Sequence, residues 1–266
     1  MITREPLLAL LRRTLQADPA VDGAWEGGSA AFERHDALSD IDAVAVVADD
    51  AVDAVFARVE SALAALSPIA LLLAMPPQPG YAQKFYRLRD AGEFLVIDLV
   101  LLRRSDPLLF REVELHGRGT TWFDRTGVLV ERHLDMAADL EAARARVPVL
   151  ATQFEMFQHL TLKEIARGHA ADALAFYLAW TLRPLVEALR LLHAPHTRVF
   201  GLRYLARDLP APVVQRVEGL AFVHDLAHLG DQQARARRWF GACALRLQTA
   251  GPGAGLAGLE APPAGG

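Results

Sequence analysis

The sequence changes character near residue 135, and this change constrains the fold more than any other feature. Before it, helical patterns alternate with strand-like apolar runs at residues 21–25, 41–47, 69–73, 83–88, 94–102 and 121–124. After it, no run has strand character, and helical patterns continue to about residue 250. The sequence therefore predicts an α+β fold, with a mixed-sheet domain at 1–135, a helical bundle at 136–250 and a disordered tail at 251–266.

Turn and capping residues set the expected helix boundaries. In the first domain we expect helices after Thr3 and at 51–66, and a helical or irregular segment from Asp106 to Leu115. In the second, we expect a break before Pro148, a kink at Pro184 and a break at Gly230. The predicted helices of the second domain are therefore 137–145, 148–167, 170–192, 202–208, 212–229 and 231–249.

Composition narrows the class of protein. The formal net charge is −4 and no basic run occurs, which argues against binding of long nucleic acid. The single cysteine, Cys243, excludes an internal disulfide and suits a reducing compartment, so we expect a cytoplasmic protein. No apolar run reaches transmembrane length and no N-terminal signal is visible, so no membrane partner is expected.

The stretch from Gly27 to Val47 concentrates the chemistry of the first domain. Gly28 and Ser29 follow a short apolar run, and they offer backbone N–H groups and a hydroxyl where a phosphate could approach closely. Asp40 and Asp42 then lead into a β-branched run. Residues i and i+2 of a strand share one face, so their carboxylates are expected side by side. Two such like charges repel unless a cation lies between them, and oxygen ligands suit Mg²⁺.

A third carboxylate, Asp98, lies inside the apolar run 94–102. An acid in such a run is costly to bury unless it meets a cation or hydrogen-bond donors. The alternative is that the Gly-Gly-Ser and Asp-x-Asp elements are a loop and a turn with solvated acids, because short motifs also match by chance.

This combination of Gly-Gly-Ser, a spacer, Asp-x-Asp and a later strand carboxylate resembles the signature of the polymerase-β-like nucleotidyltransferases. The resemblance implies that Asp40, Asp42 and Asp98 hold Mg²⁺ and are catalytic, with Asp98 able to accept the acceptor's proton. It also implies that Gly28 and Ser29 bind the β- and γ-phosphates of a nucleoside triphosphate, with ATP as the expected donor.

A helical domain behind such a catalytic domain is similar to the antibiotic nucleotidyltransferases that act on aminoglycosides and lincosamides. There, helical residues contact the triphosphate or the acceptor. Glu155, His159, Lys163 and Arg167 recur every four residues and form one polar stripe on a helix. Lys163 and Arg167 are therefore candidate nucleotide-binding residues and Glu155 a candidate base, the alternative being a solvated helix face.

The expected activity is Mg²⁺-dependent transfer of a nucleoside monophosphate, most simply AMP from ATP, to a hydroxyl of a small molecule. Alternatives are a protein-modifying (AMPylating) or antitoxin-like nucleotidyltransferase and a non-catalytic nucleotide-binding regulator. Fold-level likeness gives no substrate. Dimers occur in the resembling family, so a homodimer is possible here.

Overall fold

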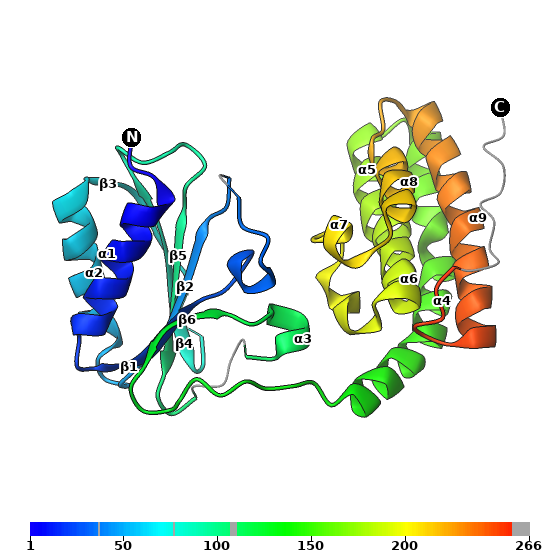
Figure 1. The fold of residues 1–266 in the computed structure, drawn as a ribbon. Helices are drawn as coiled ribbons and strands as arrows, with labels where there is room; N and C mark the ends of the chain where they lie inside the picture. Colours follow the sequence, from blue (N-terminus) through cyan, green and yellow to red (C-terminus); the bar gives the residue numbers. More distant parts are fainter. Residues whose placement is uncertain (37, 77, 107–110, 257–266) are drawn as a thin grey trace. The chain divides into compact units, whose positions relative to one another are not determined.

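The computed structural model describes residues 1–36, 38–76, 78–106 and 111–256. Contacts between residues divide the chain into two compact units, Met1–Leu134 and a second that begins at Asp135. The first contains a six-stranded mixed sheet and the second is helical, so the α+β architecture predicted from the sequence is confirmed (Figure 1). We refer to these parts as the sheet unit and the helical unit.

The sheet unit follows the predicted alternation of strands and helices. In chain order its elements are α1 Arg4–Ala17, β1 Val21–Glu26, the 3₁₀ turn η1 Ala30–Phe32, β2 Ile41–Val47, α2 Val52–Leu66, β3 Ile69–Ala74, β4 Tyr81–Leu88, β5 Ile97–Arg103, α3 Val113–His116 and β6 Thr120–Asp124. The strands lie in the order β3-β4-β5-β2-β1-β6. Strands β2 and β5 are parallel, and every other neighbouring pair is antiparallel. Residues 107–110 of the segment expected after Asp106 lie outside the described residues.

The two faces of the sheet differ. Helices α1 and α2 cover one face (Figure 1), where Ile41 and Ala43 of β2 and Ile97 and Leu99 of β5 join the main core of the unit. Side chains alternate between faces along a strand. The residues between these, including Asp42, therefore lie on the opposite face, which carries only a small buried cluster around Trp25 among the described residues.

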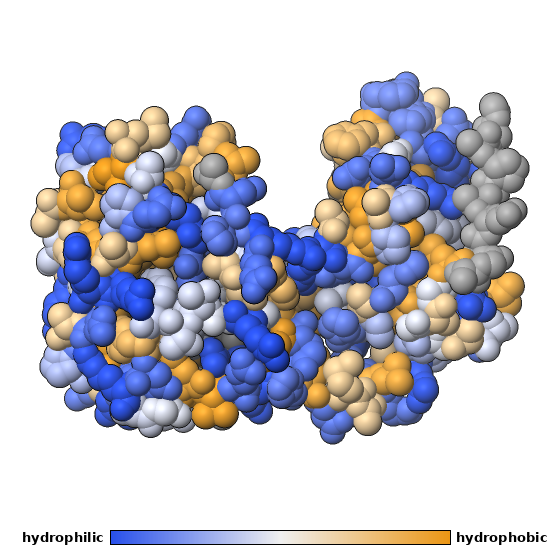
Figure 2. All heavy atoms as spheres, in the orientation of Figure 1, coloured by the Kyte–Doolittle hydropathy of each residue, from blue (hydrophilic) through white to orange (hydrophobic). Residues whose placement is uncertain are grey.

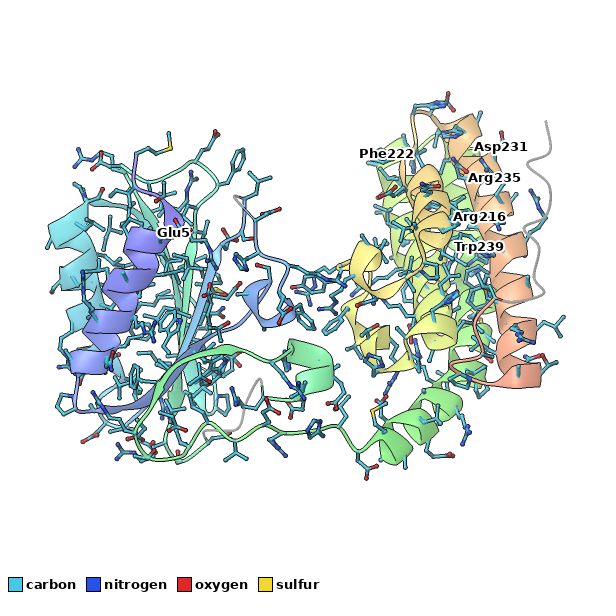
Figure 3. All side chains as sticks on the ribbon, viewed as in Figure 1. Glu5, Arg216, Phe222, Asp231, Arg235 and Trp239 are labelled. Carbon is cyan, nitrogen blue, oxygen red and sulfur yellow. The ribbon has the colours of Figure 1, made fainter. Side chains whose placement is uncertain are left out.

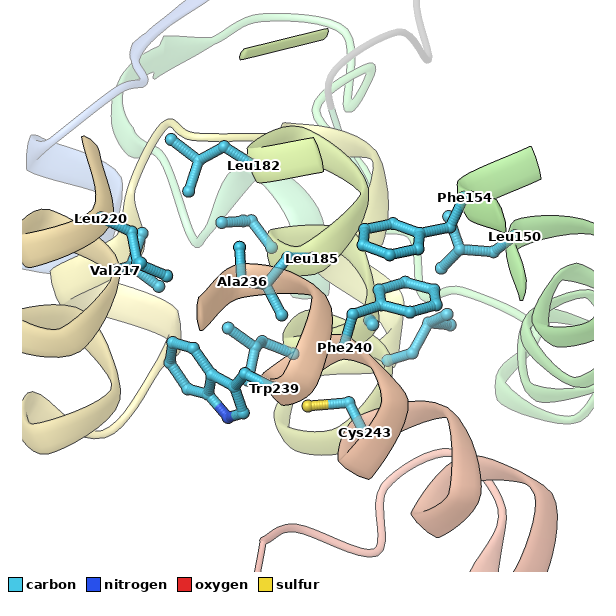
Figure 4. Packing of buried hydrophobic residues seen from close by; sticks show 14 of the residues in the cluster. Leu150, Phe154, Leu182, Leu185, Val217, Leu220, Ala236, Trp239, Phe240 and Cys243 are labelled. Atoms are coloured by element: carbon cyan, nitrogen blue, oxygen red, sulfur yellow. The ribbon is translucent and has the colours of Figure 1, made fainter. Parts of the chain in front are cut away.

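The helical unit is built from α4 to α9. Its elements are α4 Met136–Arg167, α5 Ala170–Tyr177, the π-helical turn η2 Leu178–Leu182, α6 Arg183–His193, the 3₁₀ turn η3 Pro195–Phe200, α7 Leu205–Asp208, α8 Ala211–Ala221 and α9 Leu226–Ala250. Its core is aromatic and aliphatic, with the rings of Phe154 and Phe240 stacked 3.6 Å apart and Cys243 buried beside them (Figure 4). At its margin, Arg216 of α8 lies 4.0 Å from the ring of Trp239 on α9 (Figure 3).

Two of the predicted helix breaks are wrong. Helix α4 continues through Pro148. Proline removes only the hydrogen bond to the carbonyl four residues earlier, and Arg144 is exposed, so water can satisfy that carbonyl. Helix α9 also continues through Gly230, and the break lies instead before Asp225, whose side chain accepts a hydrogen bond from His228 N at 2.7 Å.

The predicted irregularity at Pro184 is present as the π-helical turn η2. Pro184 has no N–H to donate to the carbonyl of Trp180, four residues earlier. That carbonyl accepts a hydrogen bond from Gln158 Nε2 of α4 at 2.9 Å instead. A side chain of a neighbouring helix thus replaces the backbone bond that proline removes.

On the face shown in Figure 2, apolar residues are interspersed with hydrophilic ones on each unit. Of the helices that the structure describes, none combines the length and apolar character that crossing a bilayer requires. The described part of the predicted disordered tail, residues 251–256, contains neither helix nor strand, and residues 257–266 lie outside the described residues.

Candidate active site

Asp42 and Asp98 lie side by side near the starts of β2 and β5, the two central strands of the sheet. Parallel pairing of β2 with β5 sets Asp42 opposite Asp98, and both project from the face that α1 and α2 leave uncovered. Asp40 lies two residues before Asp42, just ahead of β2, and its Oδ1 accepts a hydrogen bond from Val96 N at 3.1 Å. Three carboxylates that are separated in sequence are therefore gathered at the start of two adjacent strands.

The electrostatics of these acids reflect burial and mutual repulsion. Burial raises the pKa of Asp42, and the neighbouring Asp40 carboxylate raises it further, while the positive charge of Arg4 opposes the rise without cancelling it. The pKa of Asp98 is raised to about 6, chiefly by burial, with smaller contributions from Asp42 and Asp40. Each negative charge disfavours the others in this site, so a bound cation would be strongly favoured.

Gln83 holds Asp98 in place. Its Nε2 donates to both carboxylate oxygens of Asp98, at 2.8 and 2.9 Å, across the β4–β5 pair. These hydrogen bonds oppose the rise in the pKa of Asp98 without cancelling it. A neutral amide orients the carboxylate but brings no positive charge, so the charge of the acid remains available to a ligand.

The Gly-Gly-Ser turn packs directly against Asp42. Gly27 N donates to the carbonyl oxygen of Asp42 at 2.8 Å, which joins the turn to β2. Gly28 has a φ of +56°, and a Cβ at this position would overlap Oδ2 of Asp42. Glycine is thus required at position 28 both by its left-handed backbone and by the adjacent carboxylate.

Ser29 directly precedes the short turn η1, and its side chain makes no capping hydrogen bond there. It is partly buried, immediately after the glycine that touches Asp42. The turn that contains Gly28 and Ser29 is therefore adjacent to Asp42, and binding of a phosphate there stays a prediction.

Three further residues near the carboxylates were not identified from the sequence: Glu26, Arg4 and Gln83. Glu26, at the end of β1, is buried and forms an ion pair with Arg4 of α1. Its pKa is raised by burial and, to a smaller extent, by Asp42, while Arg4 lowers it. Glu26 could have been identified from the sequence, because it directly precedes Gly27 of the Gly-Gly-Ser turn. Nothing in the sequence pointed to Arg4 or Gln83, because their roles depend on tertiary pairing.

The polar stripe predicted on residues 155–167 is present on α4. Glu155, His159, Lys163 and Arg167 are all exposed, whereas Phe154 is buried. Arg167 Nη1 lies 2.5 Å from Glu164 Oε1, so its charge is already partnered. Within the described part of the chain, no hydrogen bond or ion pair of the Lys163 side chain is found.

A second group of polar side chains lies where α4 meets α5. Ligand atoms of Glu164, His169 and Asp172 lie within 4.8 Å of one another. Glu164 is bound by Arg167 and by His169 Nδ1, the latter at 2.8 Å. Asp172 lies in the first turn of α5, where a helix dipole favours an acid. Because Glu164 is hydrogen-bonded from both sides, this group is adequately explained as a connection between two helices.

The chain has a distant structural likeness to a known protein, without a match in sequence. No protein-family model and no curated protein matches the chain. Among solved structures, an aminoglycoside 6-adenyltransferase from Bacillus subtilis aligns with 93% of this chain and 91% of its own, at 11% identity and a TM-score of 0.35. A score this low does not establish a shared function.

Proposed function

We propose that the protein is a Mg²⁺-dependent nucleotidyltransferase that moves a nucleoside monophosphate, AMP from ATP, onto a hydroxyl of a small molecule. The observation that supports this most is the pairing of Asp42 with Asp98, with Asp40 beside them and the Gly28 turn in contact. This arrangement combines a cation site with a phosphate-binding turn on one face of a sheet.

The carboxylates fit a divalent cation. They supply hard oxygen ligands, which Mg²⁺ prefers, and burial, together with their mutual repulsion, raises the pKa of Asp42 and Asp98. Among the described residues, the only hydrogen bonds to the side chain of Asp98 come from the neutral amide of Gln83. Bound Mg²⁺ would neutralise charge on the attacking and leaving oxygens of phosphoryl transfer.

Each residue has a proposed role. Asp40 and Asp42 would hold the metal, and Asp98 would help to hold it and would accept the proton of the attacking hydroxyl. Gly28 and Ser29 bind the β- and γ-phosphates through the backbone and a hydroxyl. The hydroxyl attacks the α-phosphorus, and the bond to the bridging oxygen breaks to release pyrophosphate.

Residues of the helical unit have secondary proposed roles. The unpartnered ammonium of Lys163 is a better candidate for the triphosphate than Arg167, whose guanidinium is engaged by Glu164. Glu155 is the alternative base toward the acceptor, although it already lies 3.7 Å from Arg237. Because aminoglycosides and lincosamides are acceptors in the resembling family, they are the first compounds to test.

The test is to incubate the purified protein with ATP, Mg²⁺ and a panel of aminoglycosides, lincosamides and cell extract. We expect Mg²⁺-dependent pyrophosphate release and one acceptor that gains the mass of an adenylyl group. Chelation by EDTA and the variant Asp42→Asn should both abolish the signal. ATP binding without pyrophosphate release under any condition would instead favour a non-catalytic regulator, and adenylylated protein in the extract would favour a protein-modifying enzyme.

A further inference from the structure

One transverse row of side chains links the carboxylates to apolar residues on the outer strands of the sheet. Strand pairing sets Asp42 of β2 opposite Asp98 of β5, and Asp98 opposite Phe85 of β4. Phe85 in turn lies opposite Leu73 of β3. Residues directly opposite each other project to the same face, and in antiparallel strands their Cβ atoms are about 4.5–5.5 Å apart. The row therefore runs from two acids to two apolar side chains, on the face that α1 and α2 leave uncovered.

The contacts of its neighbours on β4 confirm the face to which Phe85 projects. Gln83, two residues before Phe85, donates through Nε2 to both carboxylate oxygens of Asp98. Alternate residues of a strand share a face, so Phe85 lies on the same side of the sheet as that carboxylate. The next residue, Tyr86, is instead buried in the core of the opposite face, and its hydroxyl bonds Glu60 of α2 at 3.2 Å.

Phe85 and Leu73 are not explained by the packing of the sheet unit. Phe85 is partly exposed, and Leu73 is 58% exposed. Among the described residues, neither belongs to the buried clusters of the unit or to the apolar side chains packed against them. An aromatic ring in this position offers a large apolar surface directly beside Asp98. We refer to Phe85 and Leu73 together as the apolar wall.

The charge of this region does not suit a polycationic acceptor. No aspartate or glutamate occurs between Glu60 and Asp90. On the same face of β4 as Phe85 lies Arg87, which is exposed and donates to the carbonyl oxygen of Glu93 at 2.7 Å. A cationic group of an acceptor would therefore meet apolar side chains and a like charge instead of acids.

We propose that Phe85 and Leu73 determine the acceptor, and that this acceptor is an alcohol with an apolar skeleton beside its hydroxyl and no cationic group. The inference rests on the proposed function, in which Asp98 takes the proton of the attacking hydroxyl. A hydroxyl at Asp98 has Asp42 on one side and Phe85 on the other, so the carbon that bears it lies over the apolar wall. The hydroxyl oxygen bonds the α-phosphorus of ATP, its proton passes to Asp98 and pyrophosphate leaves.

The first test compares alcohols that differ in polarity or in charge. Adenylyl transfer from ATP in the presence of Mg²⁺ is measured with benzyl alcohol, 4-(aminomethyl)benzyl alcohol and glycerol. We expect kcat/KM for benzyl alcohol to exceed the other two by at least about tenfold. Equal or higher values for glycerol or the amine would overturn this inference alone. Absence of Mg²⁺-dependent transfer to these alcohols and to the wider panel would overturn the proposed function as well.

Two neighbouring leucines of β3 provide matched variants for the second test. Leu73 lies opposite Phe85, whereas Leu72 lies opposite the buried Tyr86 and so projects to the other face. Leu73→Asp places an acid on the apolar wall. It should lower kcat/KM for benzyl alcohol about tenfold and raise kcat/KM for 4-(aminomethyl)benzyl alcohol. Leu72→Asp should change neither value, and equal effects of the two variants would contradict the inference.

The third test measures binding without chemistry and so separates this inference from the proposed function. Saturation-transfer NMR detects benzyl alcohol bound to the full chain in the absence of ATP and Mg²⁺. Phe85→Ala should weaken this binding at least about fivefold, because it removes the ring beside Asp98. Phe85→Leu keeps an apolar side chain and should retain most of the binding, and melting temperatures show that both variants are folded. Parental binding in Phe85→Ala would overturn the inference, whether or not the protein transfers AMP.

Discussion

The two units each contain a cluster of acidic side chains, and the clusters differ in how their charge is compensated. In the sheet unit, Asp42 and Asp98 face each other, and burial and repulsion raise the pKa of both. In the helical unit, Glu164 is paired with His169 and Arg167, and the hydrogen bond from His169 is the largest cause that lowers its pKa. In the first cluster, burial and repulsion outweigh the charge of Arg4, so the cluster suits a cation. In the second, Glu164 is hydrogen-bonded by Arg167 and His169, and these contacts join two helices.

The largest expected difference between the clusters is in catalysis. Asp42→Asn and Asp98→Asn should each lower Mg²⁺-dependent pyrophosphate release by roughly a thousandfold or more, because each removes an anionic metal ligand. Without metal, their melting temperatures should equal or exceed that of the parent, since a repulsive charge has been removed. Asp172→Asn in the helical cluster is the matched control and should retain the parental rate. Comparable losses at Asp172 and Asp42 would remove the distinction between the clusters.

The contact of Gly28 with Asp42 is the next feature to test. Gly28→Ala should weaken ATP binding by roughly ten- to a hundredfold in calorimetry, because the new Cβ displaces the Asp42 carboxylate and blocks the backbone. Gly127→Ala is the control. Gly127 also has positive φ, +71°, but a Cβ there meets nothing within 4 Å. Both variants carry the backbone strain, so equal ATP affinities in the two would argue against a phosphate-binding turn.

The two lysines of the chain test whether the helical unit takes part in nucleotide binding. Lys163→Ala should weaken ATP binding about tenfold, as expected for the loss of one charge-assisted hydrogen bond. Lys84 already bonds Glu60 at 2.7 Å and lies over the ring of Phe56, so Lys84→Ala should affect stability rather than ATP affinity. Parental ATP affinity in both variants would place Lys163 on a purely solvated face.

The smallest expected effect is the pH dependence of the Glu164 cluster. The lowered pKa of Glu164 means that its interactions stabilise the folded protein above the ordinary value of 4.5 and are lost as the pH falls below it. Glu164→Gln should therefore lower the melting temperature at pH 7 slightly, and its difference from the parent should shrink as the pH is reduced below 4.5. A difference that is constant with pH would show that the charge of Glu164 is not what stabilises this connection.

Local patterns were sufficient for most of the secondary structure. Strand β2 has the predicted bounds, 41–47, because a β-branched run after a turn has few alternative conformations. The helix breaks were less predictable. Pro148 is tolerated because the carbonyl it leaves unpaired lies on an exposed turn, and Pro184 because Gln158, from another helix, bonds the freed carbonyl. Whether a proline interrupts a helix thus depended on neighbours that are distant in sequence.

The candidate site, too, could be predicted from the sequence only in part. The sequence by itself determined which residues are proposed to carry the chemistry, because residue types and local spacing can be read without the fold: Gly28, Ser29, Asp40, Asp42 and Asp98. Only the tertiary structure decided that Asp98 lies opposite Asp42, that Gln83 orients it and that Gly28 touches Asp42. Strand register is set by the packing of a whole sheet against α1 and α2, and a shift of one residue would turn Asp98 into the core.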